Sequence, residues 1–99
     1  MQGSFPPVHA GEVLSEEFLI PFSLTPYALA RELNLPRTRI ERLVRGQTGM
    51  TADTALRLAR YFSTSPEFWM SLQSNYELTT QFLQKKQDFE GIKPQRKAA

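Results

Sequence analysis

Apolar side chains recur at helical spacing along most of this chain, and proline, glycine and asparagine separate the recurring stretches. The clearest case lies within residues 25–46, where two short apolar stripes follow one another. In the second stripe, Ile40, Leu43 and Val44 stand at i, i+3 and i+4, as on the buried face of an amphipathic helix. Asn34 lies between the stripes and tolerates the left-handed conformation that often ends a helix. The pattern therefore predicts two short helices joined by a tight turn.

Three further helices are predicted around this pair. One covers about residues 11–19, one covers about residues 52–62, and a long one starts after Ser65. Thr25, Thr51 and Ser65 each precede a helical pattern and are good N-cap residues. The residues of the first and fourth helices that are expected to face inward are Val13, Leu14, Phe18, Ala55, Leu56, Leu58, Ala59 and Phe62.

The predicted fifth helix continues to residue 83 or beyond, which is long for a chain of 99 residues, and it carries two apolar strips. The strip expected to cover the body of the domain consists of Phe68, Leu72, Tyr76, Thr79 and Leu83. The other strip contains Leu78 and Phe82 and has no evident partner in the chain, so we expect these two residues to form a dimer interface. The alternative is that the helix bends or ends near Thr79 and both strips pack internally.

The size and composition of the chain indicate one small globular domain. The chain has 40% hydrophobic residues, 22% charged residues and no cysteine, which excludes a disulfide framework and a thiolate metal site. Its apolar runs are too short to span a membrane, and its N-terminus lacks the basic start and apolar core of a secretory signal. We therefore expect a cytoplasmic protein without a membrane partner.

The net charge of +2 is unevenly distributed along the chain. Residues 1–30 carry three glutamates and no lysine or arginine, whereas residues 31–60 carry seven arginines against three acidic residues. Positive charge therefore concentrates on the predicted helix pair, where a phosphate backbone would be attracted. The alternative is an ordinary solvated helix face that happens to be rich in arginine.

The second helix of the pair carries its arginines on the side away from its apolar residues. This is the layout of a helix-turn-helix whose second helix enters the DNA major groove. Arg37, Thr38 and Arg42 are expected to contact bases, since arginine can bridge the two acceptors of a guanine. Arg39 and Arg45 lie toward the flanks of that face and are expected to contact phosphates.

Helix starts near the same face add candidate phosphate contacts, because free backbone donors at a helix N-terminus bind anions. The residues expected there are Thr25, Tyr27, Gln47, Thr48 and Thr51. The alternative for Thr25 and Thr51 is a capping role alone. Because one such motif reads only a few base pairs, we expect a homodimer that binds two half-sites of double-stranded DNA.

These elements predict the domain organisation. We expect an all-α fold of five helices, with the helix-turn-helix DNA-binding domain in residues 10–64. The C-terminal helix, in residues 65–89, is continuous with that domain and serves packing and dimerisation. We expect residues 1–9 to form a flexible N-terminal arm and residues 90–99 to form a mobile basic tail.

An enzyme is not expected, and neither is a cofactor or a metal ion. His9 is the single histidine, so a catalytic metal site would need several carboxylates from distant places. We interpret His9 as a helix-entry or surface residue. Glu16 and Glu17 are adjacent on a helix and point to different sides, which does not make an acid/base pair. The aromatic residues around Trp69 stand at helical spacing and are interpreted as core.

Four segments together match a known pattern. They are residues 9–18, residues 25–46, residues 51–59 and the string Ser65-Pro-Glu-Phe-Trp-Met-Ser-Leu-Gln73. From His9 to about residue 76 the chain resembles the HigA/VapI-type antitoxins of the phage-repressor-like (Xre-type) helix-turn-helix family. The fourth string separates these antitoxins from general phage-type repressors. Ala10 departs from the family, which more often has proline there.

This resemblance implies a five-helix, lambda-repressor-like DNA-binding domain with an extended C-terminal helix. It also implies a function. Such antitoxins dimerise, bind an operator upstream of their own operon and neutralise a HigB-type toxin, which is an mRNA-cleaving ribonuclease on a separate chain. The groove contacts of the group fall on Arg37, Thr38 and Arg42, whereas its toxin contacts do not carry over to particular residues.

Two other functions fit part of the pattern. A stand-alone transcriptional regulator without a toxin would share the fold, the arginine-rich helix and the dimer. An interaction module that has lost DNA binding would keep the fold, but the arginines on the exposed side of the second helix argue against it.

Overall fold

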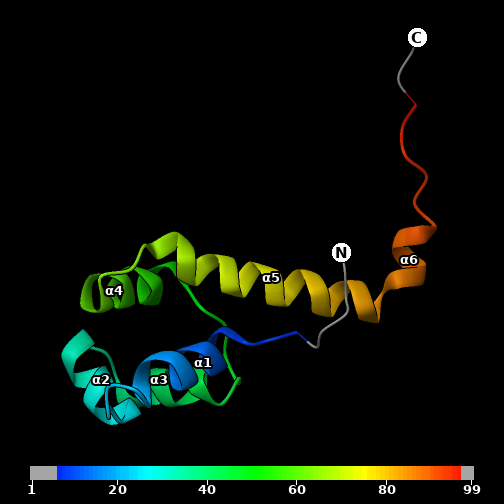
Figure 1. Ribbon diagram of the computed structural model, residues 1–99. Coiled ribbons are helices and arrows are strands. Elements are labelled where there is room, and N and C mark those ends of the chain that lie inside the picture. The colour runs from blue at the N-terminus through cyan, green and yellow to red at the C-terminus, as the bar shows by residue number, and fades with distance from the viewer. Residues whose placement is uncertain (1–6, 97–99) are drawn as a thin grey trace.

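The computed structural model describes residues 7–96, and this part of the chain is helical without strands. The helices are α1 (Ala10–Val13), η1 (Leu14–Leu19, a π-helix), α2 (Pro26–Leu33), α3 (Arg37–Val44), α4 (Ala52–Phe62), α5 (Pro66–Gln84) and α6 (Lys86–Glu90). Figure 1 shows α1, α2 and α3 grouped on one side of α4 and α5, with α5 extending well past them. The prediction of an all-α fold is confirmed. No helix of the described residues is long and apolar enough to cross a membrane.

The helix starts and ends follow local chemistry. The hydroxyl oxygens of Thr25, Thr51 and Ser65 accept hydrogen bonds from backbone N–H groups three residues ahead, at 3.0, 3.3 and 3.1 Å. Each bond satisfies one of the N–H groups that a helix start leaves free. Asn34 ends α2 at a φ of 57°, and Gly46 follows α3 at a φ of 72°. These caps and stops confirm the predicted bounds of α2, α3 and α4.

The core lies where α1, η1 and the helix pair meet α4 and the first half of α5. Its largest fully buried side chains are Trp69, Leu14, Leu29, Ile40, Leu43 and Leu58. Ile40 and Leu43 were predicted to be the buried face of α3, and the third residue of that set, Val44, is half-buried against the same core.

The first helix differs from the prediction of one regular helix in residues 11–19. It begins one residue earlier and changes from α to π geometry at Leu14. A π-turn advances the chain less than 100° per residue, so the buried positions become Leu14 and Leu19, five apart. Val13 and Phe18, which were expected to face inward, are half-buried instead, although Phe18 still packs against the core.

Gly11 is the point of closest approach between α1 and the end of α3. A Cβ atom there would lie only 1.7 Å from the carbonyl oxygen of Leu43, which is backbone and cannot rotate away. A side chain is therefore excluded, and the two helices touch directly.

His9 joins the start of α1 to α5. Its Nδ1 accepts a hydrogen bond from the Gly11 N–H at 2.9 Å, and its ring meets that of Tyr76 edge-on at 4.9 Å. The interpretation as a helix-entry residue is confirmed. Residues 1–6 of the predicted arm and residues 97–99 of the predicted tail lie outside the described residues.

Two predictions about the buried faces of α4 and α5 are wrong. Leu56 was expected to face inward from α4 but is 59% exposed. On α5 the most deeply buried residues are Trp69 and Gln73, one position beyond the predicted Phe68 and Leu72. Leu72 is still half-buried against the core, whereas Phe68 is 38% exposed. The strip shifts because the large indole of Trp69 fills the core and donates a hydrogen bond from Nε1 to the Thr64 hydroxyl at 2.7 Å.

The second half of α5 runs clear of the other helices (Figure 1). It does not end near Thr79, so the alternative of a short helix is wrong. It stops instead at Lys85, and the short helix α6 replaces the last part of the predicted helix in residues 65–89. Leu78 is 57% exposed and Phe82 is half-buried, so in this chain the second apolar strip stays largely uncovered. Leu83, which was expected to face the body, is also 54% exposed.

Candidate DNA-binding surface

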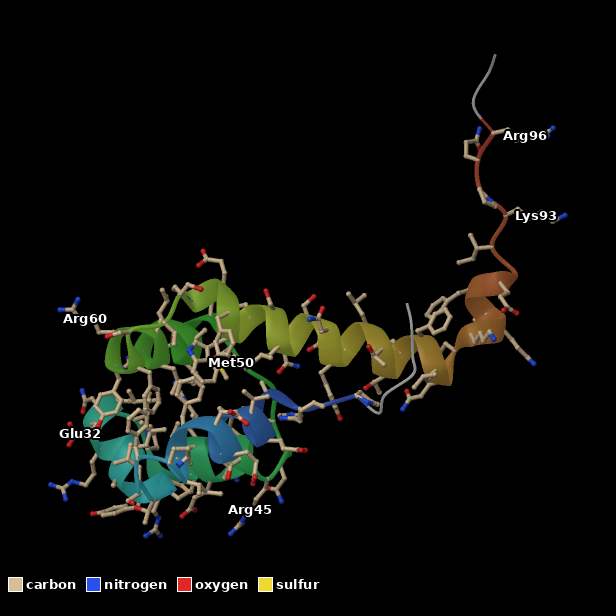
Figure 2. All side chains as sticks on the ribbon, viewed as in Figure 1. Glu32, Arg45, Met50, Arg60, Lys93 and Arg96 are labelled. Atoms are coloured by element: carbon tan, nitrogen blue, oxygen red, sulfur yellow. The ribbon has the colours of Figure 1, made fainter. Side chains whose placement is uncertain are left out.

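Helices α2 and α3 form the predicted helix-turn-helix. The turn is closed by the Leu35 N–H, which donates to the Ala30 carbonyl at 2.9 Å. Ile40 and Leu43 anchor α3 to the core, which leaves its opposite side in solvent. The side chains of Arg37, Thr38, Arg39, Arg42 and Arg45 are all exposed. Figure 2 shows Arg45 reaching away from the body near the end of α3.

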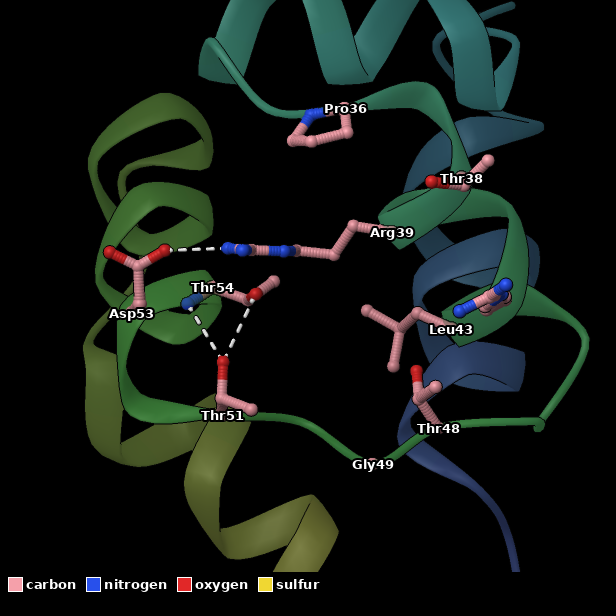
Figure 3. Close-up of a pocket in the computed structure, with 10 residues that line it drawn as sticks. Pro36, Thr38, Arg39, Leu43, Thr48, Gly49, Thr51, Asp53 and Thr54 are labelled. Carbon is pink, nitrogen blue, oxygen red and sulfur yellow. Dashed lines mark hydrogen bonds and ion pairs between the residues drawn. The ribbon is translucent and has the colours of Figure 1, made fainter.

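A groove of about 500 Å³ lies between α3 and the start of α4. It brings together Thr38 and Arg42, expected to contact bases, with Arg39, Thr48 and Thr51, expected to contact phosphates. Figure 3 shows Thr38 and Arg39 on the α3 wall and Thr51 at the start of α4, with the α3–α4 loop closing one end. The structure therefore gathers five of the predicted contacts around one concave surface.

Arg39 crosses this groove to α4 (Figure 3). Its guanidinium donates to the Asp53 carboxylate at 2.8 Å, and Arg57 donates to the same oxygen at 3.0 Å. Arg57 also donates to the Leu33 carbonyl at the end of α2, at 2.9 Å. The Asp53–Arg57 pair therefore belongs to a chain of contacts that links α2, α3 and α4.

The pKa of the Asp53 carboxyl lies below its ordinary value. The hydrogen bond from Arg57 lowers this pKa below its ordinary value, and the Arg39 hydrogen bond and the charges of both guanidinium groups lower it further, while partial desolvation opposes them. Asp53 therefore stays ionised at neutral pH and holds Arg39 in a defined position.

Replacing Asp53 by asparagine is expected to flatten the loss of stability in acid. Because the folded chain lowers this pKa, the two ion pairs stabilise the fold at any pH above the unfolded value. That contribution disappears as the pH falls below about 4. The free energy of unfolding, measured with urea from pH 7 to pH 3, should therefore fall less in Asp53→Asn than in the unchanged chain. Equal slopes in both would show that Asp53 titrates normally, and Glu12→Gln, on an exposed residue of α1, is the control.

Arg37 lies outside the groove, on the side facing α2. Its Nε is 3.4 Å from a carboxylate oxygen of Glu41, and its guanidinium carbon is 5.7 Å from the centre of the Tyr27 ring. Arg31 approaches the same ring at 5.9 Å. The structure thus brings Arg37, a predicted base contact, together with Tyr27, a predicted phosphate contact, at the edge where α2 meets α3.

The starts of α2 and α4 retain free backbone donors. Thr25 and Thr51 act as caps, and the Thr51 hydroxyl also donates to the Thr54 hydroxyl at 3.2 Å. The capping role is therefore confirmed for both residues, and an additional phosphate contact stays a prediction. Gln47 and Thr48 are exposed on the α3–α4 loop.

The sequence did not reveal Asp53 as the partner of Arg39, nor Gln73 as a buried polar residue beneath the α3–α4 loop. Both contacts join residues that are far apart in the chain, at separations of 14 and 23 positions. For the Arg39–Asp53 contact, the only local signal was an acidic residue in the first turn of α4. For the Met50–Gln73 contact there was no local signal.

An all-α domain whose second motif helix exposes a row of arginines defines a helix-turn-helix protein of the DNA-binding class. The chain belongs to the helix-turn-helix family HTH_3, whose model matches residues 16–69, and its relatives include HigA and VapI proteins. The resemblance that the sequence suggested is confirmed.

Three similar proteins describe this relationship. The chain is 46% identical over 77 residues to virulence-associated protein I of Dichelobacter nodosus, covering 78% of this chain and 71% of that protein. It is 38% identical over 72 residues to antitoxin HigA-1 of Vibrio cholerae, covering 73% and 68%. Among solved structures, the Pseudomonas aeruginosa antitoxin HigA with the higBA promoter is 46% identical and has a TM-score of 0.87, covering 91% of this chain and 99% of that one.

Proposed function

We propose that this protein is the antitoxin of a type II toxin–antitoxin system and that it binds operator DNA as a homodimer. In this role it represses its own operon and neutralises a HigB-type, mRNA-cleaving toxin in the cytoplasm. The observation that carries DNA binding is the exposed arginine face of α3 beside a groove lined by Thr38, Arg42 and Thr48. The similarity to a HigA antitoxin solved with its promoter supports the same function.

Within that surface, Arg37, Thr38 and Arg42 are proposed to read bases from the major groove. They stand on the N-terminal part and outer face of α3, which is where the second helix of this motif meets base edges. Arg39, Arg45 and the donors at the helix starts are proposed to meet phosphates, which fix the register of the protein but carry no sequence information. For Arg39 this contact competes with the Asp53 carboxylate.

A mobility-shift measurement tests DNA binding directly. A duplex with the region upstream of the coding sequence should be bound more tightly than a shuffled duplex of the same length, by about 10³-fold or more. Equal affinity for both duplexes would contradict sequence-specific repression.

The homodimer is proposed to form through the second half of α5. Leu78 and Phe82 are one helical turn apart on a segment that leaves the body of the domain, and Leu83 is exposed beside them. Exposure of an apolar strip of this kind to water is unfavourable, and pairing of two copies would bury it. Pairing would place two copies of α3 on half-sites about one turn of DNA apart, roughly 34 Å.

Replacing Leu78 by aspartate is expected to shift the protein from dimer to monomer, because a carboxylate would be buried in an apolar interface. Sedimentation equilibrium at micromolar concentration measures the mass directly. Gln84→Asp is the matched control, since Gln84 is exposed on α5 at least a third of a turn from both Leu78 and Phe82 and also gains a negative charge. An unchanged dimer in Leu78→Asp would place the interface elsewhere.

The toxin partner separates the antitoxin from a stand-alone regulator. The protein should co-purify with the product of an adjacent reading frame that encodes a small ribonuclease, and it should suppress the growth arrest which that product causes. Operator binding without any such complex would favour the stand-alone regulator.

A further inference from the structure

Gln73 is a buried polar side chain in the first half of α5. It is 8% exposed, and both ends of its amide are used. Its Oε1 accepts a hydrogen bond from the Met50 N–H at 2.5 Å, and its Nε2 donates to a carboxylate oxygen of Glu77 at 2.6 Å. Because Glu77 accepts from the NH₂ group, the carbonyl end of the amide is oriented toward Met50.

The α3–α4 loop passes directly over this amide. A Cβ atom on Gly49 would lie 2.8 Å from Nε2 of Gln73, which is closer than a side chain tolerates. The φ angle of Gly49 is not in the left-handed region, so this glycine serves the close approach and not a special backbone conformation. The next residue, Met50, is 4% exposed and inserts into the core.

The opposite side of the same loop faces the proposed DNA. Thr48 and Gly49 line the groove, and Thr51 begins α4 at its edge. In the described part of the chain, the backbone from Thr48 to Met50 is tied to the rest of the protein by one hydrogen bond, the one to Gln73. Just before this segment, the Gln47 N–H donates to the Arg42 carbonyl near the end of α3.

We propose that Gln73 is a positioning residue that holds the α3–α4 loop against α5 for contact with the DNA backbone. The proposal rests on the proposed DNA-binding function. Gln73 touches no base or phosphate itself and acts through Gly49 and Met50. Since α5 also carries the proposed dimer strip, the same hydrogen bond ties the phosphate-contacting loop of each copy to the helix that sets the distance between the two copies.

Gln73→Met tests the proposal, because methionine has a similar shape and neither hydrogen-bonding end. Affinity for the upstream duplex should fall about five- to tenfold, the range that loss of one well-placed hydrogen bond produces. Affinity for a shuffled duplex should fall by the same factor, because backbone contacts carry no sequence information. The slope of log K against log salt should stay unchanged, because the loop offers neutral donors that release no counterions.

Two measurements separate positioning from simple destabilisation. Binding is measured well below the melting temperature of each variant, and hydrogen exchange of the Met50 amide reports the tether itself. Phe68→Ala is the stability control, since Phe68 packs against Phe18 and Trp69. This control should lower the melting temperature and leave DNA affinity within twofold of the unchanged chain.

If Gln73→Met does not fold, the DNA affinity of Gly49→Ala tests the proposal instead. The new methyl group displaces the flexible end of Gln73, and binding should weaken in the same way. When both variants fold, the double variant should bind no more weakly than Gln73→Met alone, whereas a direct clash of the methyl group with DNA would add a further loss. Unchanged affinity together with fast exchange at Met50 would overturn the proposal. Failure of the unchanged chain to bind the upstream duplex would instead overturn the proposed function.

Discussion

Replacing Trp69 by alanine is expected to lower the free energy of unfolding by about 3–5 kcal/mol, as large truncations of a buried aromatic residue do. Trp69 is completely buried and lies 4.9 Å, between ring centres, from both Phe18 and Phe68. Its indole also donates to Thr64 at the start of the α4–α5 connection. Truncation would open a cavity between η1, α4 and α5. It would also remove the ring that Phe18, Phe62 and Phe68 all approach. Urea unfolding followed by circular dichroism measures the change.

Two control variants make this result specific. Trp69→Phe keeps a ring but loses the hydrogen bond to Thr64 and some volume, so the loss should be about 1–2 kcal/mol. Leu56→Ala removes an apolar side chain that is 59% exposed, and its effect should stay within about 0.5 kcal/mol. A loss below 1 kcal/mol for Trp69→Ala would mean that the domain does not depend on this cluster.

Replacing Arg42 by alanine is expected to weaken operator binding by about 10- to 100-fold, the usual cost of one bidentate base contact of 1–3 kcal/mol. Arg42 is exposed, lines the groove beside Thr38 and forms no ion pair within the described residues. Arg37 and Arg39, by contrast, pair with Glu41 and Asp53. Arg42 is therefore the arginine on the groove whose guanidinium is available without breaking an internal contact.

The pattern of loss distinguishes a base contact from a phosphate contact. Arg42→Ala should reduce the difference in affinity between the operator and single-base variants of it at one position. Arg45→Ala should weaken every duplex alike and lower the slope of log K against log salt by about 0.9. A uniform loss for Arg42→Ala, with specificity intact, would assign Arg42 to the backbone.

Much of the fold could be predicted because helix ends depend on residues within a few positions of one another. The N-caps Thr25, Thr51 and Ser65 lie where predicted, and Asn34 ends α2 in the left-handed conformation. The outward direction of the α3 arginines also followed from local spacing. The π-geometry of η1 could not be predicted in this way. It places Leu14 and Leu19, five positions apart, in the same core, and that core is formed with residues distant in the chain.

The buried face of α5 shows why periodicity was insufficient there. Apolar residues surround much of this helix, so several strips satisfied the same spacing. Contact with η1 and α4 selected Trp69 and Gln73, and a glutamine is buried because Met50 supplies its donor and Glu77 its acceptor. A polar residue with two distant partners cannot be distinguished from a surface residue by hydrophobicity.

The sequence by itself determined α2, α3 and α4, the N-caps of α2, α4 and α5, the arginine-rich face of α3 and the family, because each of these depends on short stretches of chain. Only the tertiary structure decided that Arg39 is engaged by Asp53, because this ion pair joins α3 to α4, whereas the Arg37–Glu41 pair lies within α3. It also decided that the α3–α4 loop is held by Gln73, 23 positions from Met50. Such contacts depend on how the helices pack, and packing is a property of the whole core.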